Sequence, residues 1–407
     1  MRCQVSADSV FFDNALYKYV YEGAGSLLPC WLAYAVAGLV IILILVNAVL
    51  LGAAVLTWLE RRVLGRLQNR IGPNRWGPFG LLQPIADLIK LLTKEDLMPS
   101  GADRAVFSLV PLVMMAPLLM MTAVIPFSKN TALADLNVGV LFVLAASSVT
   151  TIAIFMAGWS SNNRYSLFGA ARGVAMLISY EVPVVLCLLG VVLLAGSMSL
   201  GDIVAAQAIP FLLVQPLAFI VFITGMSAEL NRTPFDLAEA ESETIAGFHT
   251  EYSGMKFALI FAAEAGGVLV VSAVIATLFL SGWTGPFADF LGWLWLLFKT
   301  LLVVFAFIWV RATFPRLRLD QIMALSWKFL LPLSMINLGA TAVQVYFLRG
   351  PEGTLTPGDL WIMAGINIPL ALVSIALFGT LVKDRVRLAP ARRAPWLVPG
   401  VPTVEVS

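Results

Sequence analysis

Long apolar runs recur along the chain. A helix needs about 20 mostly apolar residues to cross a bilayer, and nine segments of the 407-residue sequence approach or exceed that length. They are residues 31–58, 105–126, 138–158, 173–195, 211–228, 255–280, 290–311, 327–348 and 361–382. The pattern predicts an all-α fold, a polytopic membrane helix bundle of about nine transmembrane helices, with no internal repeat.

The segment after the first span combines basic and turn-forming residues. Residues 60–78 are rich in Arg, Gly and Pro, which predicts a structured turn region. An amphipathic pattern follows, with apolar residues on one helical face at Leu81, Ile85, Leu88, Ile89 and Leu92. Such a helix lies in the membrane interface. It either anchors the bundle or forms a platform for a lipid-like substrate, and its geometry leaves both open.

The loop after the fifth span, residues 229–254, is acidic. Thr233 as N-cap, Pro234 at the first helical position and Asp236 in a capping-box-like pattern predict a short helix over 234–246. Asp236, Glu239 and Glu243 then share one face, where like charges repel. The bland explanation is a solvated acidic face, and the functional one is a group of proton carriers.

Composition and charge agree with a membrane protein. Hydrophobic residues make up 60% of the chain and charged residues 12%, whereas soluble domains have about 45–50% and about 25%. Of the 26 Lys and Arg, 21 fall in the loops after the odd-numbered spans, at nearby span ends or in the C-terminal tail. The positive-inside rule makes this side cytoplasmic and the N-terminus external. Because the basic residues sit between apolar spans, nucleic acid is not an expected partner.

Cofactor-binding patterns are missing from the sequence. The three cysteines have no metal-ligand spacing, and His249 is the only histidine. There is no G-x-G-x-x-G or P-loop at a strand-to-helix junction. We therefore expect no metal or redox cofactor on this chain, so any redox groups belong to partners. The first 30 residues do not resemble a cleaved signal peptide.

Three ionisable residues lie within predicted spans: Glu181, Glu264 and Lys299. An ionised group at membrane depth costs at least about 2.5–3.5 kcal/mol, so it normally faces a polar cavity. One explanation is a structural ion pair between Lys299 and a carboxylate. The other is a proton relay, because neighbouring buried carboxylates have raised and coupled pKa values and a relay group must exchange its proton near neutral pH.

The run from Glu60 to Asp87 resembles the signature of subunit 1/H of respiratory complex I, the proton-pumping NADH:quinone oxidoreductase. That signature is ER-x-x-x-G-x-x-Q-x-R-x-GPN-x-x-GP-x-GLLQP-x-AD, and every fixed position matches. Further matches occur at 179–182, 228–254 and 311–321, and the resemblance covers about 30–348. The chain departs from the pattern at Ala265, where an aromatic residue is common, and in its ninth span, which we expect to pack peripherally.

The resemblance implies a membrane subunit that carries no redox cofactor, forms the entrance and floor of the quinone chamber, and couples quinone reduction to proton translocation. It implies that FMN and iron–sulfur clusters lie on partner subunits. Implied partners are peripheral-arm subunits at the cytoplasmic loops, small membrane subunits next to the antiporter-like arm, and quinone and lipids of a bacterial inner membrane. The quinone-binding residues would be Glu60, Arg61, Arg70, Asp87 and Phe235. The charge relay would comprise Glu181, Glu229, Asp236, Glu239, Glu241, Glu243 and Glu264.

The resemblance also divides the chain into an external segment (1–30), an eight-span core (31–348), an external loop with the added span (349–382) and a cytoplasmic tail (383–407). Two alternatives stay open. The homologous subunit of a membrane-bound hydrogenase is disfavoured by the quinone-type first loop and the intact acidic run. A stand-alone secondary transporter is disfavoured because such proteins tend to contain internal repeats.

Overall fold

The computed structural model describes residues 15–25, 29–129, 131–236, 246–349 and 355–387, which form helices and connecting segments without a strand. Eight of its helices are long and apolar enough to cross a bilayer. A shorter apolar helix, α9 (Pro216–Glu229), falls on the remaining predicted span. The predicted all-α polytopic bundle is therefore confirmed.

The other helices, in chain order, are α1 (Ala15–Gly25), α2 (Cys30–Leu67), α3 (Gln83–Thr93), α4 (Arg104–Val124), α5 (Gly139–Ser160), α6 (Arg164–Ala195), α7 (Leu200–Ala206), α8 (Phe211–Val214), α11 (Gly254–Phe279), α12 (Ala288–Thr313), α13 (Leu319–Leu325), α14 (Leu331–Leu348) and α15 (Pro357–Arg387). Single helical turns at Pro78–Gly80, Gly247–His249 and Ser326–Leu330 complete the described secondary structure. The last of these is a π-helical turn, called the π-turn below.

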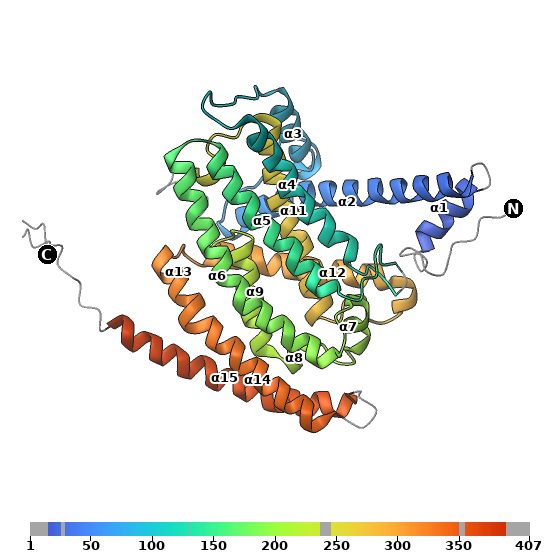
Figure 1. Cartoon of the computed structure of the whole chain (residues 1–407), viewed down its shortest axis with the longest axis vertical. Coiled ribbons are helices and arrows are strands. Elements are labelled where there is room, and N and C mark those ends of the chain that lie inside the picture. Colours follow the sequence, from blue (N-terminus) through green and yellow to red (C-terminus); the bar gives the residue numbers. More distant parts are fainter. Residues whose placement is uncertain (1–14, 26–28, 130, 237–245, 350–354, 388–407) are drawn as a thin grey trace, which may run out of the picture.

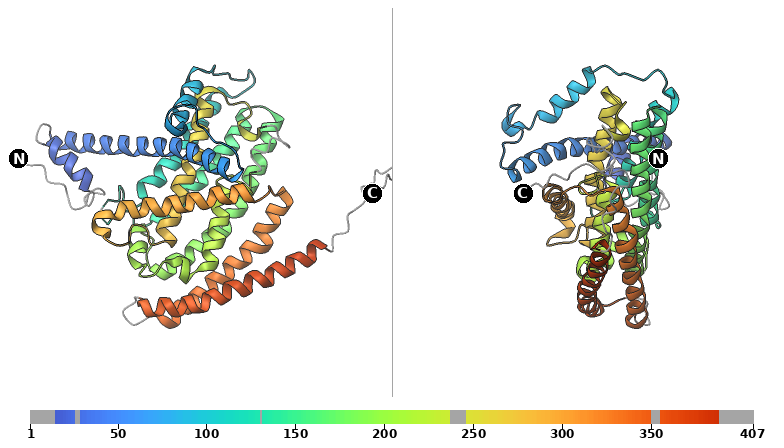
Figure 2. Two further views of the ribbon diagram at one scale, coloured as in Figure 1. Left: turned by 180° about the vertical axis from the view of Figure 1, so that it is seen from behind. Right: turned by 90° about the vertical axis from the view of Figure 1, so that its left-hand side faces the viewer.

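The centre of the bundle is formed by α4, α5, α6, α9 and α11 (Figure 1). The most enclosed long helix is α11, because 67% of its apolar segment is buried. It packs against α4 on one side and against α2 and α12 on the other. The edge-on view in Figure 2 shows a narrow slab of helices with α3 outside its main layer. There, α3 rests on α2 and α11.

The first membrane-spanning helix, α2, is longer than the sequence pattern predicts. A turn region was expected from Glu60, but α2 continues to Leu67 and has 38 residues. At about 1.5 Å per residue it is about 57 Å long, well beyond the ~30 Å hydrocarbon core. The helix persists because no proline occurs between Pro29, which precedes it, and Pro73, and because Gly65 lies where the returning loop crosses it. A Cβ on Gly65 would lie 3.0 Å from the backbone nitrogen of Gly72.

The fifth and eighth predicted spans are interrupted helices. Gln215 separates α8 from α9, because Pro216 has no backbone N–H to continue the ladder. The buried Gln215 side chain donates from Nε2 to the Gly190 carbonyl (3.3 Å) and to Thr341 Oγ1 (2.8 Å). The eighth span consists of α13, the π-turn and α14.

The other two helix predictions have different outcomes. The amphipathic helix is present as α3, and its apolar Ile85, Ile89 and Leu92 are exposed by 54%, 55% and 56%. The short helix predicted to begin at Pro234 does not begin there, because residues 233–235 form a turn. The Pro234 carbonyl accepts a hydrogen bond from the Leu317 nitrogen (3.1 Å), which ties this turn to the segment after α12.

The ninth span, α15, lies at the edge of the bundle (Figure 1). It packs against α8, α9 and α14. Its contact face includes the buried Met363, Ala364 and Asn367. This helix follows the core on its outer side and does not approach α2 or α3.

Candidate functional site

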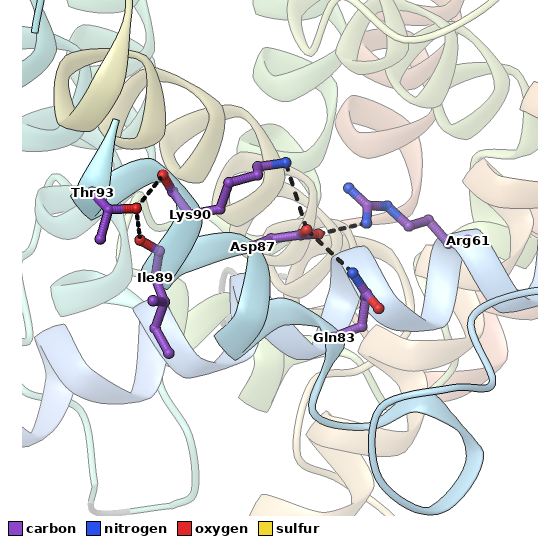
Figure 3. Close-up of polar contacts among 6 residues, drawn as sticks. All are labelled: Arg61, Gln83, Asp87, Ile89, Lys90 and Thr93. Carbon is purple, nitrogen blue, oxygen red and sulfur yellow. Dashed lines mark hydrogen bonds and ion pairs between the residues drawn. The ribbon is translucent and has the colours of Figure 1, made fainter. Parts of the chain in front are cut away.

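The amphipathic helix is fixed to the first span by an ion pair between Arg61 and Asp87 (Figure 3). Arg61 donates from Nη1 to Asp87 Oδ2 at 2.7 Å, and Gln83 donates from Nε2 to Asp87 Oδ1 at 3.2 Å. Lys90 adds a longer contact of 3.7 Å. Because these bonds occupy the polar face of α3, its apolar face points away from α2, in the orientation of an interfacial helix.

The loop between α2 and α3 folds back on α2 through backbone contacts that require glycine. Gly80 has φ +75°, and a Cβ there would lie 2.3 Å from the Pro73 carbonyl oxygen. The Phe79 carbonyl accepts from Arg62 Nη1 at 2.5 Å and from Trp58 Nε1 at 3.1 Å. The Arg62 guanidinium also lies 5.0 Å from the Phe79 ring centroid, a cation–π contact. The Gly- and Pro-rich segment of the signature thus forms a compact turn held against α2.

Arg70 lies on the outer side of this turn. Its Nε donates to Gln68 Oε1 at 2.8 Å. Together with Arg62 and Arg66 it lines an open cavity of about 410 Å³ that contains no carboxylate. Arg70 is therefore not in the cavity that contains Glu60 and Arg61.

Glu60 connects three separate parts of the chain. Its Oε1 accepts hydrogen bonds from Arg232 Nη1 (2.9 Å), in the segment after α9, and from Arg311 Nη1, in the last turn of α12. The Glu60 side chain is 13% exposed and that of Arg232 15%. One carboxylate between two guanidinium groups leaves this cluster with a net positive charge. It also fixes the start of the acidic loop against α2.

A cavity of about 170 Å³ opens beside this cluster. Its lining includes Glu60, Arg61, Arg232 and Arg311 together with Glu264 of α11. A cavity needs roughly 10–15 Å³ of such volume to hold one water, so this one has room for several. The structure therefore brings a predicted relay residue to the predicted entrance residues.

Glu264 also lines a second cavity, of about 60 Å³, together with Glu229, Ser147 and Thr150. The two cavities share Glu264 and the segment Leu230–Asn231 as a wall. A third, smaller void of about 20 Å³ lies beyond Glu229 and Ser147. Glu264 thus lines the first and second cavities and Glu229 the second and third, while the rest of the third lining is apolar apart from Ser147.

Two neighbouring serines of α5, Ser147 and Ser148, lie beside carboxyl groups of α6 and α9. Ser148 Oγ donates to Glu181 Oε1, and Ser147, whose Oγ donates to the Leu144 carbonyl at 2.9 Å, lines the same two cavities as Glu229. Glu181 and Glu229 are close enough for their charges to interact. A hydroxyl both donates and accepts, so this arrangement can pass a proton as well as hold the Glu181 side chain.

Phe235 and Asp236 are buried at the start of the acidic loop. The Phe235 ring is 2% exposed and packs edge-on against Tyr180, with 5.2 Å between ring centroids. Asp236 Oδ2 accepts from Arg316 Nη2 at 2.7 Å, and the Asp236 side chain is 5% exposed. The idea of a solvated acidic face is therefore wrong for Asp236. Glu239, Glu241 and Glu243 lie outside the described residues.

The far end of this loop is fixed as well. The Tyr252 ring stacks on Phe107 of α4 at 4.1 Å, and its hydroxyl lies 3.4 Å from Ser160 Oγ. Burial raises the pKa of Tyr252 to about 12, so the phenol stays neutral at physiological pH. The described residues at both ends of the acidic loop, Asp236 and Tyr252, are therefore fixed to the bundle.

Comparison with known proteins shows which family the chain belongs to. A sequence model described as NADH dehydrogenase matches residues 40–342. The chain is 55% identical over 345 residues to the H subunit of NADH-quinone oxidoreductase from Dehalococcoides mccartyi (strain CBDB1), which covers 85% of this chain and 95% of the relative. The match to the H 2 subunit from Syntrophobacter fumaroxidans is 50% over 315 residues (75% and 95%), and that to the H subunit from Geobacillus kaustophilus 52% over 290 residues (70% and 86%).

The chain belongs to the family of NADH-quinone oxidoreductase H subunits. The resemblance drawn from residues 60–87 is thereby confirmed, and the stand-alone transporter is set aside. As a member of this family, the chain is a multi-pass membrane component of an enzyme complex. The whole of α15 lies beyond the segment that the family model matches.

The intramembrane lysine of this chain does not pair with a buried carboxylate. Lys299 Nζ donates to the carbonyl oxygens of Gly282 (2.9 Å) and Thr284 (2.8 Å), in the turn before α12. The ion-pair explanation is therefore wrong, and Lys299 does not neutralise Glu181 or Glu264. Among the residues the structure describes, no group of three or more His, Cys, Asp or Glu could hold a metal ion.

Sequence reasoning missed four polar partners in this chain: Arg232, Arg311, Ser147 and Ser148. The arginines lie 172 and 251 residues from Glu60, so no local pattern could pair them. The serines left a signal, because Ser147, Ser148 and two threonines interrupt an otherwise apolar span. A polar run inside a membrane helix usually faces a polar partner.

Proposed function

We propose that this chain forms the entrance and floor of a quinone chamber at the cytoplasmic surface of the bacterial inner membrane, and couples quinone reduction to proton translocation through a chain of carboxylates. The observation that carries the proposal is a succession of cavities that share carboxyl residues. Glu60 and Arg61 share a cavity with Glu264, and Glu264 shares the next one with Glu229. The relatives' names, NADH-quinone oxidoreductase, support quinone as the substrate of the assembled complex.

The entrance is assigned to the joint between α2 and α3. A quinone has a polar head and an apolar tail, and this joint offers matching surfaces. The exposed apolar face of α3 suits the tail, and the Arg61–Asp87 pair lies beside the cavity that would lead the head inward. Arg70 is proposed to act at the outer rim. Phe235 is proposed to contact quinone only after its ring leaves Tyr180.

The charged path runs from the entrance cavity into the bundle. Glu264 lines both the cavity that contains Glu60 and the cavity that contains Glu229. Its carboxyl group can therefore take a proton from one and release it to the other. Glu229 follows, and Ser147 and Ser148 link it to Glu181. Asp236, Glu239, Glu241 and Glu243 would extend the path along the acidic loop. The cavities are large enough for the waters that such transfers need.

The partners follow from the same assignment. The electrons must come from FMN and iron–sulfur clusters on peripheral subunits, which would dock on the cytoplasmic loops. Small membrane subunits would continue the path from Glu181 toward the antiporter-like arm. This assignment places the N-terminus outside and the C-terminal tail in the cytoplasm, in agreement with the distribution of Lys and Arg.

The test uses Glu264→Gln and Glu229→Gln in the assembled complex, in membrane vesicles. Glutamine keeps the size and hydrogen-bonding capacity but cannot carry a proton. We expect both variants to assemble and to lose most quinone-coupled proton pumping. Glu239→Gln and Glu243→Gln extend the test to the part of the path in 237–245.

The matched control is Glu251→Gln. Glu251 lies at the same end of the bundle, accepts from Asn163 Nδ2 at 2.6 Å and lines none of the three cavities. It should leave pumping unchanged. Wild-type turnover and pumping in both Glu264→Gln and Glu229→Gln would remove the basis for the relay.

A further inference from the structure

The fourth span contains a proline, Pro183, two residues after its half-buried Glu181. Pro183 has no backbone N–H, so the carbonyl of Ser179, four residues earlier, loses its donor within α6. Ser179 is 4% exposed, which leaves little access for water. A buried carbonyl needs a partner, and that partner must come from another helix.

The replacement donor is Ser326, the first residue of the π-turn. Ser326 Oγ donates to the Ser179 carbonyl at 2.6 Å, and Ser326 is 1% exposed. A π-turn adds one residue to a helical turn and is frequent at functional sites. Here the extra residue changes the rotation of α13 relative to α14, and the side chain at its first position meets the carbonyl that Pro183 leaves free.

Two more contacts connect the same short segments. Tyr180 donates from its hydroxyl to the Ile322 carbonyl at 3.0 Å. Ser179 Oγ donates to the Ala175 carbonyl of its own helix at 2.7 Å and also lies 3.5 Å from Met323 Sδ. Both residues preceding Glu181 are thus attached to 322–326.

Glu181 lies between this anchor and the proposed charged path. On the far side its carboxylate accepts from Ser148 of α5 and interacts with the charge of Glu229. The Tyr180 ring meanwhile packs against Phe235 at the start of the acidic loop. The backbone direction at Ser179–Tyr180 therefore decides where the Glu181 carboxylate points.

We propose that Ser326 is a positioning residue, which supplies the hydrogen bond that Pro183 removes and so fixes the backbone of α6 at Ser179–Tyr180, which directs Glu181 toward Ser148. The π-turn thus anchors α6 at its proline from outside the helix. This role rests on the proposed relay through Glu181. The anchoring of α6 and the relay can be measured separately.

The experiment measures amide hydrogen exchange of the segment 176–187 in the purified, nanodisc-embedded complex, and protons pumped per electron in vesicles. Ser326→Ala removes the donor. We expect exchange in that segment to become roughly tenfold faster, as for loss of a buried hydrogen bond, and the pumping ratio per assembled complex to fall. Ser326→Thr keeps a hydroxyl and should restore both.

Two further variants make the result specific. Pro183→Ala restores a backbone donor for the Ser179 carbonyl, so the double variant Ser326→Ala/Pro183→Ala should recover slow exchange. Ser334→Ala is the control, because Ser334 is fully buried and bonds only to the Leu331 carbonyl of its own helix. It should change neither reading.

Wild-type exchange and pumping in Ser326→Ala would overturn the proposal. If that variant does not assemble, recovery of assembly in the double variant supports the anchor, and failure to recover contradicts it. Glu181→Gln decides the relay independently. Normal pumping there, together with fast exchange in Ser326→Ala, would refute the relay while leaving the anchoring of α6 by Ser326 intact.

Discussion

Glu60 of α2 and Arg311 of α12 form an ion pair, and both residues line the cavity that Glu264 also lines. Arg232 binds the same carboxylate oxygen from a third direction. The pair joins the first and seventh spans and, through Arg232, the start of the acidic loop. A change in the charge of Glu60 would therefore be felt at the entrance and along the loop together.

Glu60→Gln should destabilise the assembled complex. It leaves two guanidinium groups close together with no counter-charge, and hydrogen bonds to charged groups contribute about 1.5–3 kcal/mol each. Because the Arg311 side chain is 33% exposed, we expect the lower end of that range. The measurement is the melting temperature of the complex in nanodiscs.

The double variant Glu60→Gln/Arg311→Gln is the control for charge. Removing a partner together with the charge costs less than leaving a partly buried charge unpaired. It should be more stable than Glu60→Gln alone. A double variant that melts lower than the single one would contradict this account of the cluster.

Asp87→Asn should weaken quinone entry with little effect on stability. It loses the ion pair with Arg61, whose side chain is 48% exposed, and pairs of this kind are worth about 0.2–1 kcal/mol. We expect KM for quinone to rise while kcat changes little, because α3 loses its fixed position on α2. Lys90→Gln, with a contact of 3.7 Å and 71% exposure, should leave KM unchanged. An equal loss of kcat in Asp87→Asn would place Asp87 elsewhere in the reaction.

The loop and the amphipathic helix illustrate how far sequence alone could go. The periodicity of apolar residues from Leu81 to Leu92 was enough to predict α3, because one face of an interfacial helix is simply apolar. The end of α2 was not predictable from composition. The chain at Glu60–Leu67 is helical because the Gly72 backbone packs on Gly65, and that contact exists only once the loop has folded back.

The carboxylates show the same limit. Glu181 and Glu264 were recognisable because an ionisable residue inside an apolar span is costly and normally faces a polar cavity or partner. Their partners were not. Neither Ser148 beside Glu181 nor the cavity between Glu264 and Glu60 follows from spacing along the chain. The capping pattern at Thr233 was overridden because Asp236 binds Arg316 and the Pro234 carbonyl binds the Leu317 nitrogen.

Gly80→Ala should disrupt the entrance loop. Gly80 has φ +75°, where a residue with a Cβ costs about 1–2 kcal/mol, and the added Cβ would lie 2.3 Å from the Pro73 carbonyl oxygen. We expect reduced assembly and reduced quinone turnover per complex. The control is Gly38→Ala in the first span, α2, where an added Cβ meets nothing within 4 Å and the change should be neutral. Normal assembly and turnover of Gly80→Ala would mean that this turn has another accessible conformation.

The added span should be held by one asparagine. Asn367 of α15 donates from Nδ2 to the Val214 carbonyl (2.8 Å), at the break between α8 and α9. It also forms a reciprocal amide pair with Gln344 of α14, with distances of 2.7 and 3.0 Å. Hydrogen bonds between membrane helices contribute about 0.6–2 kcal/mol each, so Asn367→Leu should loosen α15 measurably.

The expected result is faster proteolysis at the end of α15 in the intact complex, with quinone turnover unchanged, because α15 does not line the cavities between Glu60 and Glu229. Thr380→Val is the control, since that hydroxyl bonds only to the Leu377 carbonyl of its own helix. Resistance of α15 to protease in Asn367→Leu would show that apolar packing alone holds it. A loss of turnover would instead tie the polar contact at Val214 to the chemistry, since α9 continues from that break to Glu229.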